Sequence, residues 1–378
     1  MDFKNYLVPG KTGLLIGIGG VSMSPLAEVL HDAGLDIRGS DMAESSNTLT
    51  LRERGIPIHI GHSADNVTDD ISFVIRTAAV HDDNPEVHEA HRRGIPVFER
   101  TQAWGALMRG YQNALCISGT HGKTTTTSMC THIMMAAEKD PTVMIGGTLP
   151  LLKACHRVGK GNTIIMESCE YYNSFLALNP TIAVVLNIEA DHLDFFKDLE
   201  DIKHSFRCFA ERVPAETGTV IANYDDANTM DALRGIARKV ITFGLNAKAD
   251  VYAQNIVHRG SVSEFDIYHR GNYFARVTLH VPGIHNVRNA LAATAAAIVL
   301  GVSPNAVKYG LAGFEGAGRR FDFKGKFQGA DLYDDYAHHP SELRALLDAV
   351  DTLNYQRTIV VFQPHTYSRT AKLFNDFV

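Results

Sequence analysis

Short apolar runs alternate with longer segments of helical periodicity through most of this chain. The first run, from Lys11 to Gly19, ends in the glycine-rich turn Gly17-Ile18-Gly19-Gly20, and apolar residues then recur at helical spacing from Met23 to Leu30. Further apolar runs lie near residues 36–39, 56–60, 71–75 and 95–98. Strands that alternate with helices form a parallel sheet with helices packed on it. Residues 1–110 are therefore predicted to be an α/β domain.

A second α/β unit begins with the apolar run Asn113 to Ser118. The pattern predicts strands near residues 163–166, 181–186 and 240–243, a helix over 198–212, an alanine-rich helix over 286–300 and a shorter helix from Pro304. Residues 249–281 differ, because apolar and polar residues alternate around Arg259-Gly260 and Arg270-Gly271, as in antiparallel hairpins. We interpret this stretch as a small β insertion in a domain of residues 111–315.

The glycine-rich stretch Gly313 to Gly318 ends this pattern and marks a predicted domain boundary. In residues 316–378 we expect strands near 331–333 and 358–362, and a helix that begins near Ser368 and continues to Val378. A doubly wound domain has more strands than these, so we expect an incomplete third domain with one apolar face uncovered.

Length and charge restrict the class of protein. At roughly 150 residues per domain, the 378 residues correspond to about 2.5 domains. The 36 basic and 42 acidic residues give a net charge of -6 without a basic run, so a nucleic-acid partner is not expected. We find no signal-peptide pattern and no membrane-spanning apolar stretch, and predict a cytoplasmic protein. The five cysteines are widely spaced without a C-x-x-C motif and are expected to be reduced.

The sharpest chemical signal is the loop from Gly119 to Thr127, between an apolar strand and a helix. Glycines there let backbone N–H groups approach phosphate oxygens, Lys123 supplies a charge for the β- and γ-phosphates, and the Thr124 hydroxyl suits Mg²⁺. Only two residues separate the glycines, where the standard phosphate-binding motif has four. The alternative is a chance Gly-Lys-Thr turn, which the flanking strand and helix disfavour.

The N-terminal turn is a weaker nucleotide-binding signal. Gly17, Gly19 and Gly20 are followed by Ser22, where the dinucleotide motif has its third glycine, and by Met23. Asp41 closes the second strand, where a carboxylate can contact a ribose. A tight structural turn is the alternative interpretation.

Acids and histidines follow several predicted strands. Glu167 comes after one strand, and the stretch Asn187 to His192 after another. Because ligands of parallel sheets gather at the carboxyl ends of strands, Glu167 and His192 could meet the glycine loop around a divalent ion, or the acids could only cap helices. Later clusters contain Asn286, Asn289, Arg320, Asp335, Tyr336, His338, His365 and Arg369, groups that suit a phosphoryl group and a carboxylate substrate, although any one alone could be a solvated loop residue.

Together these motifs resemble the ATP-dependent Mur ligases of peptidoglycan synthesis, from Gly13 to Val378. The most specific are Gly17 to Met23 with Gly39 to Asp41, Gly119 to Thr127, Asn187 to His192, His285 to Asn289, Gly318 to Asp322, Asp334 to Pro340 and Gln363 to Arg369. The resemblance implies three domains: a Rossmann-like domain for the UDP-sugar, a P-loop domain for ATP, and a Rossmann-like C-terminal domain that brings the amino acid. The implied reaction joins L-alanine to UDP-N-acetylmuramate through an acyl phosphate, in a monomer or homodimer.

The resemblance also implies a role for each residue. ATP would be bound by Gly119, Thr120, His121, Gly122, Lys123, Thr124, Thr125, Asn286, Asn289, Arg320 and Asp335, and Mg²⁺ by Thr124, Glu167 and His192. The UDP-sugar would contact Gly17, Gly19, Gly20, Ser22, Met23, Asp41, Thr120 and His121, and the amino acid would contact Tyr336, His338, His365 and Arg369. The catalytic set would be Lys123, Glu167, His192, Arg320 and His338.

Three alternatives remain open from the sequence. A related ligase could attach a whole tripeptide to the same UDP-sugar, a nucleotide-binding oxidoreductase could use the Gly17 turn, or the chain could be a non-catalytic nucleotide-binding fragment. The chain has Ser168-Cys169 and Tyr171-Tyr172 where family members often have Ala-Asp and smaller polar residues. Because the third domain is expected to be incomplete, we expect binding of UDP-N-acetylmuramate and ATP but slow turnover.

Overall fold

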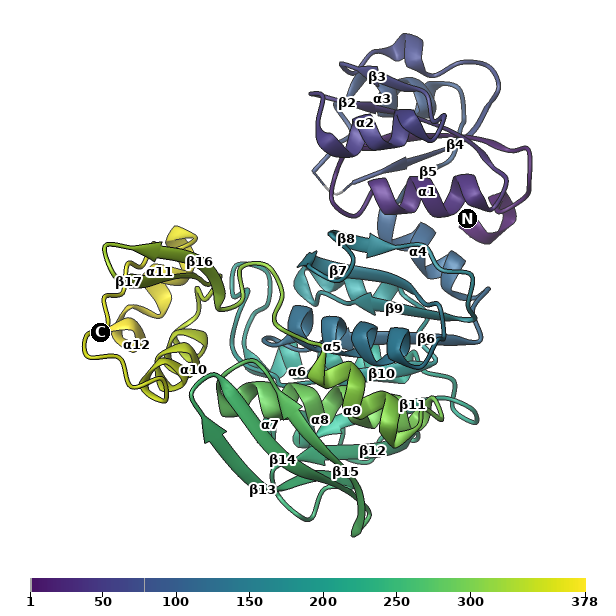
Figure 1. The fold of residues 1–378 in the computed structure, drawn as a ribbon. Coiled ribbons are helices and arrows are strands. Elements are labelled where there is room, and N and C mark those ends of the chain that lie inside the picture. Colours follow the sequence, from purple (N-terminus) through teal and green to yellow (C-terminus); the bar gives the residue numbers. More distant parts are fainter. Residues whose placement is uncertain (1, 78) are drawn as a thin grey trace. The chain divides into compact units, whose positions relative to one another are not determined.

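The computed structural model describes residues 2–77 and 79–378. Contacts group the chain into two compact units, one running to Tyr111 and including Ala177–Asn179, the other made of Gln112–Leu176 and Pro180–Val378 (Figure 1). Each unit is considered by itself below. The predicted boundary near residue 315 lies inside the second unit and stays a prediction.

The first unit is an α/β layer around a five-stranded parallel sheet of order β3-β2-β1-β4-β5. Its strands are β1 (Thr12–Ile16), β2 (Asp36–Asp41), β3 (Ile58–Ile60), β4 (Ile71–Arg76) and β5 (Val97–Glu99). Its helices are α1 (Ser24–Asp32), α2 (Ser46–Glu53), α3 (Pro85–Arg92) and α4 (Arg100–Met108), with 3-10 turns η1 (Phe3–Tyr6) and η2 (Ala64–Asn66). Strand β1 is buried along its whole length, as expected for a central parallel strand.

The second unit contains a ten-stranded sheet of order β15-β14-β13-β12-β11-β10-β6-β9-β7-β8. Its strands are β6 (Asn113–Ser118), β7 (Thr142–Leu149), β8 (Ala154–Arg157), β9 (Thr163–Glu167), β10 (Ile182–Val185), β11 (Thr219–Asn223), β12 (Lys239–Gly244), β13 (Val251–Arg259), β14 (Val262–His269) and β15 (Asn272–Leu279). The stretch from β13 to β7 is parallel, whereas β14, β15 and β8 pair antiparallel. The predicted hairpins are confirmed, and they continue the central sheet because β13 pairs with β12.

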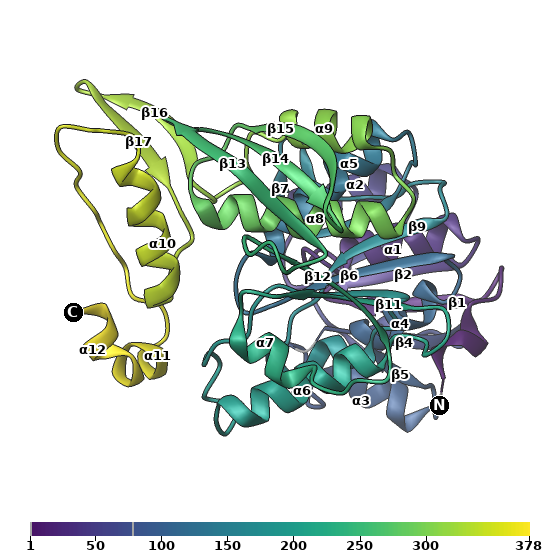
Figure 2. The same cartoon turned by 90° about the horizontal axis from the view of Figure 1, so that it is seen from below.

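Helices cover both faces of this sheet. They are α5 (Lys123–Ala136), α6 (Leu199–Glu211), α7 (Ala227–Ala232), α8 (Ile284–Val299) and α9 (Pro304–Ala312), with a 3-10 segment η3 (Tyr171–Ala177). Figure 2 shows α5, α8 and α9 on one face and α6 and α7 on the other. The alanine-rich α8 is almost entirely buried from Val287 to Ala297, since small side chains let it approach α5 and the sheet closely.

The C-terminal segment forms an antiparallel pair, β16 (Asp322–Phe327) and β17 (Ala330–Asp334), followed by α10 (Pro340–Asp351), α11 (Tyr367–Lys372) and α12 (Phe374–Phe377). The strand predicted near residues 358–362 is wrong, since no strand forms there and Val361 is 95% exposed. A strand requires a hydrogen-bonding neighbour, and the β16–β17 pair offers none to this apolar run. Phe323, Phe327 and Leu332 are exposed, in agreement with the expected uncovered apolar face.

All five cysteines of the chain carry free thiols. Among the described residues, no helix combines the length and apolar character needed to cross a bilayer.

Candidate active site

The loop between β6 and α5 has the geometry of a phosphate cradle. Gly119 and Gly122 have positive φ values of 144° and 83°, and Gly122 is the residue directly before α5. A Cβ at Gly122 would lie 2.7 Å from Asn289 Oδ1, so backbone conformation and close packing both require glycine. The N-terminus of α5 therefore presents its backbone N–H groups in the arrangement that suits phosphate.

The sheet order places this loop where ligands bind in open α/β sheets. Strand β6 lies between β10 and β9, and both neighbours are parallel to it. Strands β9 and β10, which follow β6 along the chain, lie on opposite sides of it. In open α/β sheets such a change of side opens a crevice at the carboxyl end of the central strand. Glu167 ends β9 and the Asn187–His192 stretch follows β10, so the predicted acid and histidine segments border that crevice.

Lys123 is already paired with a carboxylate. Its Nζ lies 3.0 Å from Glu170 Oε2 and donates hydrogen bonds to the carbonyls of Gly119 and Thr120. Burial opposes the charge, but Glu170 outweighs it and raises the pKa of Lys123 above its usual value. Glu170, 2% exposed, was not among the residues that sequence reasoning selected for the site, although it stands only three positions after Glu167.

Two of the three predicted Mg²⁺ ligands are in contact. Thr124 Oγ1 donates a hydrogen bond of 3.1 Å to Glu167 Oε1, and Glu167 Oε2 accepts the N–H of Gly146 at 2.7 Å. A hydroxyl and a carboxylate at a helix N-terminus fit a hard cation that prefers oxygen ligands.

His192 is held by a different set of contacts. Its Nε2 lies 3.8 Å from both Glu170 Oε1 and Asp191 Oδ2, and its ring stacks on Tyr171 with centroids 4.3 Å apart. Burial lowers the pKa of His192 despite these acids. The neutral imidazole that results is the form that can bind a metal ion.

A cavity of about 370 Å³ opens at the N-terminus of α5. Its lining includes eight residues of the predicted ATP set, namely His121, Gly122, Thr124, Thr125, Asn286, Asn289, Arg320 and Asp335. Asn289 Nδ2 donates to Asn286 Oδ1 at 3.2 Å, and Asn286 Nδ2 donates to the Pro282 carbonyl at 2.7 Å, so the two amides are fixed at the start of α8. The cavity combines a phosphate-binding helix end with apolar and amide groups, as a nucleotide site requires.

Asp335 and Arg320 bring the C-terminal segment to this cavity. Asp335 accepts the N–H groups of Phe321 and Ala337, each at 2.7 Å, and burial raises the pKa of its carboxyl. Arg320 lies 4.0 Å from Glu342, and its guanidinium lies 5.3 Å from the centre of the Tyr336 ring. The cationic end of Arg320 therefore borders the same space as the glycine loop.

A second cavity, of about 200 Å³, contains the whole predicted amino-acid set. Tyr336, His338, His365 and Arg369 line it, together with His192 and Asp191. Arg369 Nε lies 3.0 Å from Asp191 Oδ1, and its Nη2 lies 2.9 Å from the same oxygen, with both side chains more than 90% buried. The sequence motifs did not assign Asp191 to the site. Its carboxylate forms an ion pair with the Arg369 guanidinium, the group that would bind a substrate carboxylate.

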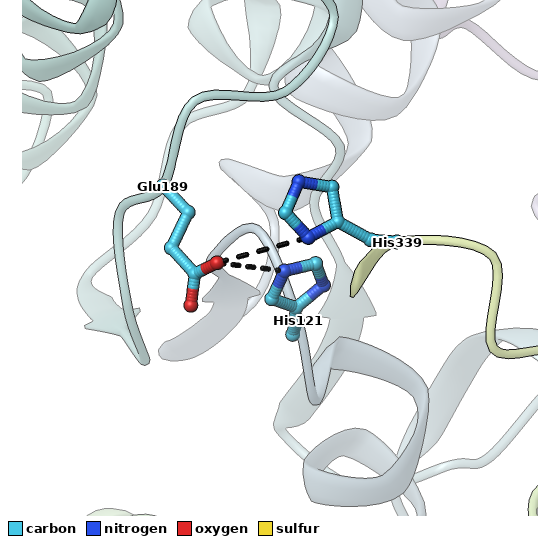
Figure 3. Close-up of side chains that lie close together, drawn as sticks. All are labelled: His121, Glu189 and His339. Carbon is cyan, nitrogen blue, oxygen red and sulfur yellow. Dashed lines mark ion pairs between the residues drawn. The ribbon is translucent and has the colours of Figure 1, made fainter. Parts of the chain in front are cut away.

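A polar cluster joins the glycine loop to the start of α10. Figure 3 shows Glu189 facing both His121 and His339, at 3.4 Å and 3.8 Å respectively. The Ser341 hydroxyl donates to Glu189 Oε2 at 2.7 Å and lies 3.0 Å from His121 Nε2. Burial lowers the pKa of His121, but hydrogen bonds to Glu189 and Glu342 outweigh it and raise the pKa to about 9. Glu189 and His339 lie inside motifs recognised in the sequence, and Ser341 and Glu342 follow directly after Pro340, but nothing in their spacing indicated this contact.

The residues predicted to bind the UDP-sugar lie in both compact units. In the first unit, the N–H of Gly19 donates to Asp41 Oδ2 at 2.8 Å, so Asp41 closes the glycine turn. Ser22 contacts Arg100, and Met23 is 2% exposed. Thr120 and His121 belong to the second unit. The UDP-sugar roles of these residues stay predictions.

Three family models match the chain in sequence order. The Mur ligase family, catalytic domain, matches residues 15–112, the Mur ligase middle domain 117–297, and the Mur ligase, glutamate ligase domain 319–378. The UDP-N-acetylmuramate--L-alanine ligase of Agathobacter rectalis is 47% identical over 363 residues, which cover 96% of this chain and 79% of that protein. The chain belongs to the Mur ligase family. The resemblance predicted from the motifs is thereby confirmed, and membership supports the use of ATP.

Other relatives agree with this assignment to the Mur ligases. The UDP-N-acetylmuramate--L-alanine ligase of Clostridium novyi is 46% identical, with all of this chain and 82% of that protein covered. The crystal structure of UDP-N-acetylmuramate-alanine ligase from Thermotoga maritima matches with a TM-score of 0.79 and 31% identity over 96% of this chain and 83% of that one. The tripeptide-attaching ligase of Neisseria meningitides matches less well, with a TM-score of 0.73 and 26% identity over 81% of this chain and 99% of that one.

Proposed function

We propose that this Mur ligase uses ATP to join L-alanine to UDP-N-acetylmuramate, in peptidoglycan precursor synthesis. The observation that carries the proposal is that two cavities, one at the phosphate-binding loop and one around Arg369, are both completed by residues of the C-terminal segment. Such an arrangement suits a reaction in which ATP first activates a carboxylate and an amino acid then reacts with the activated group. ATP and UDP-sugars are nucleotides of the cytoplasm, which is the compartment we propose for the reaction.

In the first step, the lactyl carboxylate of the sugar attacks the γ-phosphate of ATP to give an acyl phosphate and ADP. Lys123 and Arg320 would stabilise the charge on the phosphoryl oxygens, and Lys123 would have to exchange Glu170 for phosphate. Thr124 and Glu167, with His192 nearby, would hold Mg²⁺, which would neutralise phosphate charge when bound. Catalysis of this kind depends on positioning and electrostatics rather than on a protein nucleophile.

In the second step, the amine of L-alanine attacks the acyl carbon and phosphate leaves. Arg369 would bind the α-carboxylate of L-alanine, and the small second cavity would limit the size of the amino-acid side chain that the site accepts. His338 is one candidate to accept the amine proton, since its Nδ1 lies 2.8 Å from the Tyr336 carbonyl, which favours a proton on Nδ1 and leaves Nε2 as the base. A phosphate oxygen is the other candidate.

Phosphate release tests the proposal directly. The chain is incubated with ATP, Mg²⁺ and UDP-N-acetylmuramate, and release is compared with L-alanine, with a muropeptide-derived tripeptide and with neither. Release that depends on L-alanine is expected, and Lys123→Ala should abolish it. Release only with the tripeptide would instead establish the tripeptide ligase, which the Neisseria likeness keeps as the second candidate.

A further inference from the structure

We propose that His121, Glu189 and His339 form a binding site for a first-row transition-metal ion, best filled by Zn²⁺. Their ligand atoms all lie within 4.8 Å of one another (Figure 3). Two imidazoles and one carboxylate are a donor set that zinc proteins use. The site is separate from the Thr124–Glu167 contact and goes beyond the proposed ligase function.

The spacing of the ligand atoms fits a tetrahedral ion. Glu189 Oε2 lies 3.4 Å from His121 Nε2 and 3.8 Å from His339 Nδ1. Zinc bonds of about 2.0–2.1 Å at tetrahedral angles place ligand atoms about 3.4 Å apart. Small side-chain movements would therefore be enough to close the three groups around one ion.

Ser341 supplies a polar atom at the fourth corner. Its Oγ lies 2.7 Å from Glu189 Oε2, 3.0 Å from His121 Nε2 and 2.7 Å from His339 Nδ1. A hydroxyl that touches all three atoms shows that they point into a common space. With an ion bound there, this hydroxyl or a water molecule would be the fourth ligand.

A second carboxylate orients the first imidazole. His121 Nδ1 lies 3.1 Å from Glu342 Oε1, so a proton on Nδ1 would leave Nε2 directed at the cluster. Metal-binding histidines are commonly fixed by a carboxylate on the other ring nitrogen. Nitrogen ligands also discriminate against Mg²⁺, which prefers oxygen, so the site should remain selective in excess Mg²⁺.

The ion would connect the phosphate-binding loop to the start of α10, two parts of the chain that both line the cavity of the proposed ligase reaction. His121 lies in the phosphate-binding loop, and His339 and Ser341 lie at the start of α10. The cavity at the glycine loop is lined by His121, Glu189 and Ser341, which gives an ion a path to the site. Zinc bound there would hold the loop against α10 and so slow turnover.

Metal titration of the full chain tests the site without relying on activity. Metal-stripped protein in excess Mg²⁺ is titrated with Zn²⁺ against a chromophoric chelator at about pH 8, since binding must displace a proton from His121. Co²⁺ is added separately to record the visible absorbance of a tetrahedral site. We expect one tight site per chain, weakened at least tenfold in Glu189→Gln and in His339→Gln. The matched control is His258→Gln, in the β13–β14 hairpin, where His258 contacts Ser263.

Circular dichroism first establishes that each variant is folded. Should His339→Gln fail to fold, Glu189→Gln carries the test, because the Glu189 side chain is 36% exposed. Binding by the unmodified chain that is no tighter than by Glu189→Gln would overturn the proposal. In a separate arm, micromolar Zn²⁺ should inhibit phosphate release by the unmodified chain, and a chelator added afterwards should restore it. Failure of the ligase reaction itself would leave the binding result intact.

Discussion

Lys123 has a counter-charge before any phosphate arrives. Its side chain is 14% exposed and that of its partner Glu170 is 3% exposed, so the ion pair is largely removed from water. A buried pair adds little stability compared with an apolar pair, but losing one partner leaves an uncompensated charge. Glu170 therefore has a structural role, and in the proposed reaction it would release Lys123 when ATP binds.

Neutralising Glu170 should destabilise the chain. We expect Glu170→Gln to lower the free energy of unfolding by about 3 kcal/mol, measured by urea denaturation. The control is Glu200→Gln, because Glu200 also pairs with a lysine, Lys203, but is 74% exposed. The control should change the stability little, and equal losses in the two variants would contradict the role assigned to burial.

His121 should make the stability depend on pH. Its pKa rises from 6.5 to about 9 on folding, so its contribution is fully present below pH 6.5 and is lost as the pH rises through 9. We expect a loss of up to about 3 kcal/mol across this interval. Urea denaturation in metal-free buffer measures it, and the slope should flatten in His121→Asn. A stability that rises with pH over this interval would rule the assignment out.

At the scale of elements, the turn from β6 into α5 requires glycine for two reasons that can be separated. Gly122 has a positive φ and also lies against Asn289, whereas Gly235 has a positive φ of 69° and no atom within 4 Å of the point where a Cβ would lie. Backbone strain is therefore common to both positions. The close packing against α8 is present only at Gly122.

Alanine at these two glycines should have different effects on nucleotide binding. We expect Gly122→Ala to weaken ADP binding at least tenfold, because the added methyl pushes Asn289 away from the loop. Gly235→Ala should cost about 1 kcal/mol of stability and leave ADP affinity unchanged. Isothermal titration calorimetry with ADP distinguishes the two, and similar affinities in both variants would refute the packing argument.

Local pattern predicted most strands of the two larger sheets, but not all of them. The predicted strand Asn113 to Ser118 coincides with β6, and the hairpins around Gly260 and Gly271 are present. The apolar run at residues 358–362 failed because a strand depends on a partner as much as on its own residues. Local pattern did not predict strands β7, β8, β11 and β16 or helices α7 and α10, although α10 begins at Pro340, the last residue of the motif Asp334 to Pro340.

The same limit applies to the candidate site. Glycine, histidine and arginine motifs indicated residues that do line the two cavities. Their acidic partners were missed, because a pair such as His121 and Glu342 is 221 positions apart in sequence and meets only in the folded chain. The spacing of residues in the sequence identifies functional groups that share one turn or one strand end. The acids that pair with them come from distant segments and are placed only by tertiary packing.

At the scale of the whole molecule, the chain consists of two compact units with separate cores. The phosphate-binding loop and both described cavities belong to the second unit. The predicted UDP-sugar turn belongs to the first. Ligands should therefore stabilise the units unequally.

Calorimetry can resolve this division. We expect two unfolding transitions. ADP at about 100 times its Kd should stabilise only the transition of the second unit, Gln112–Leu176 with Pro180–Val378, by about 2.7 kcal/mol. Hydrogen exchange of α5 and α8 identifies that transition. A single transition would show that the units unfold as one, and an equal shift of two transitions would contradict the selective stabilisation of the second unit by ADP.

The contact between Arg369 and Asp191 has a consequence for inhibitor discovery. A screen for carboxylate fragments would find the guanidinium of the second cavity already satisfied by an internal acid. Each fragment would have to displace Asp191 from Arg369, so its measured affinity would be lower than its contacts with the pocket alone would give. Screening against Asp191→Asn would remove the competitor and reveal fragments that the unmodified pocket hides, and these could then be extended toward the nucleotide cavity to recover affinity.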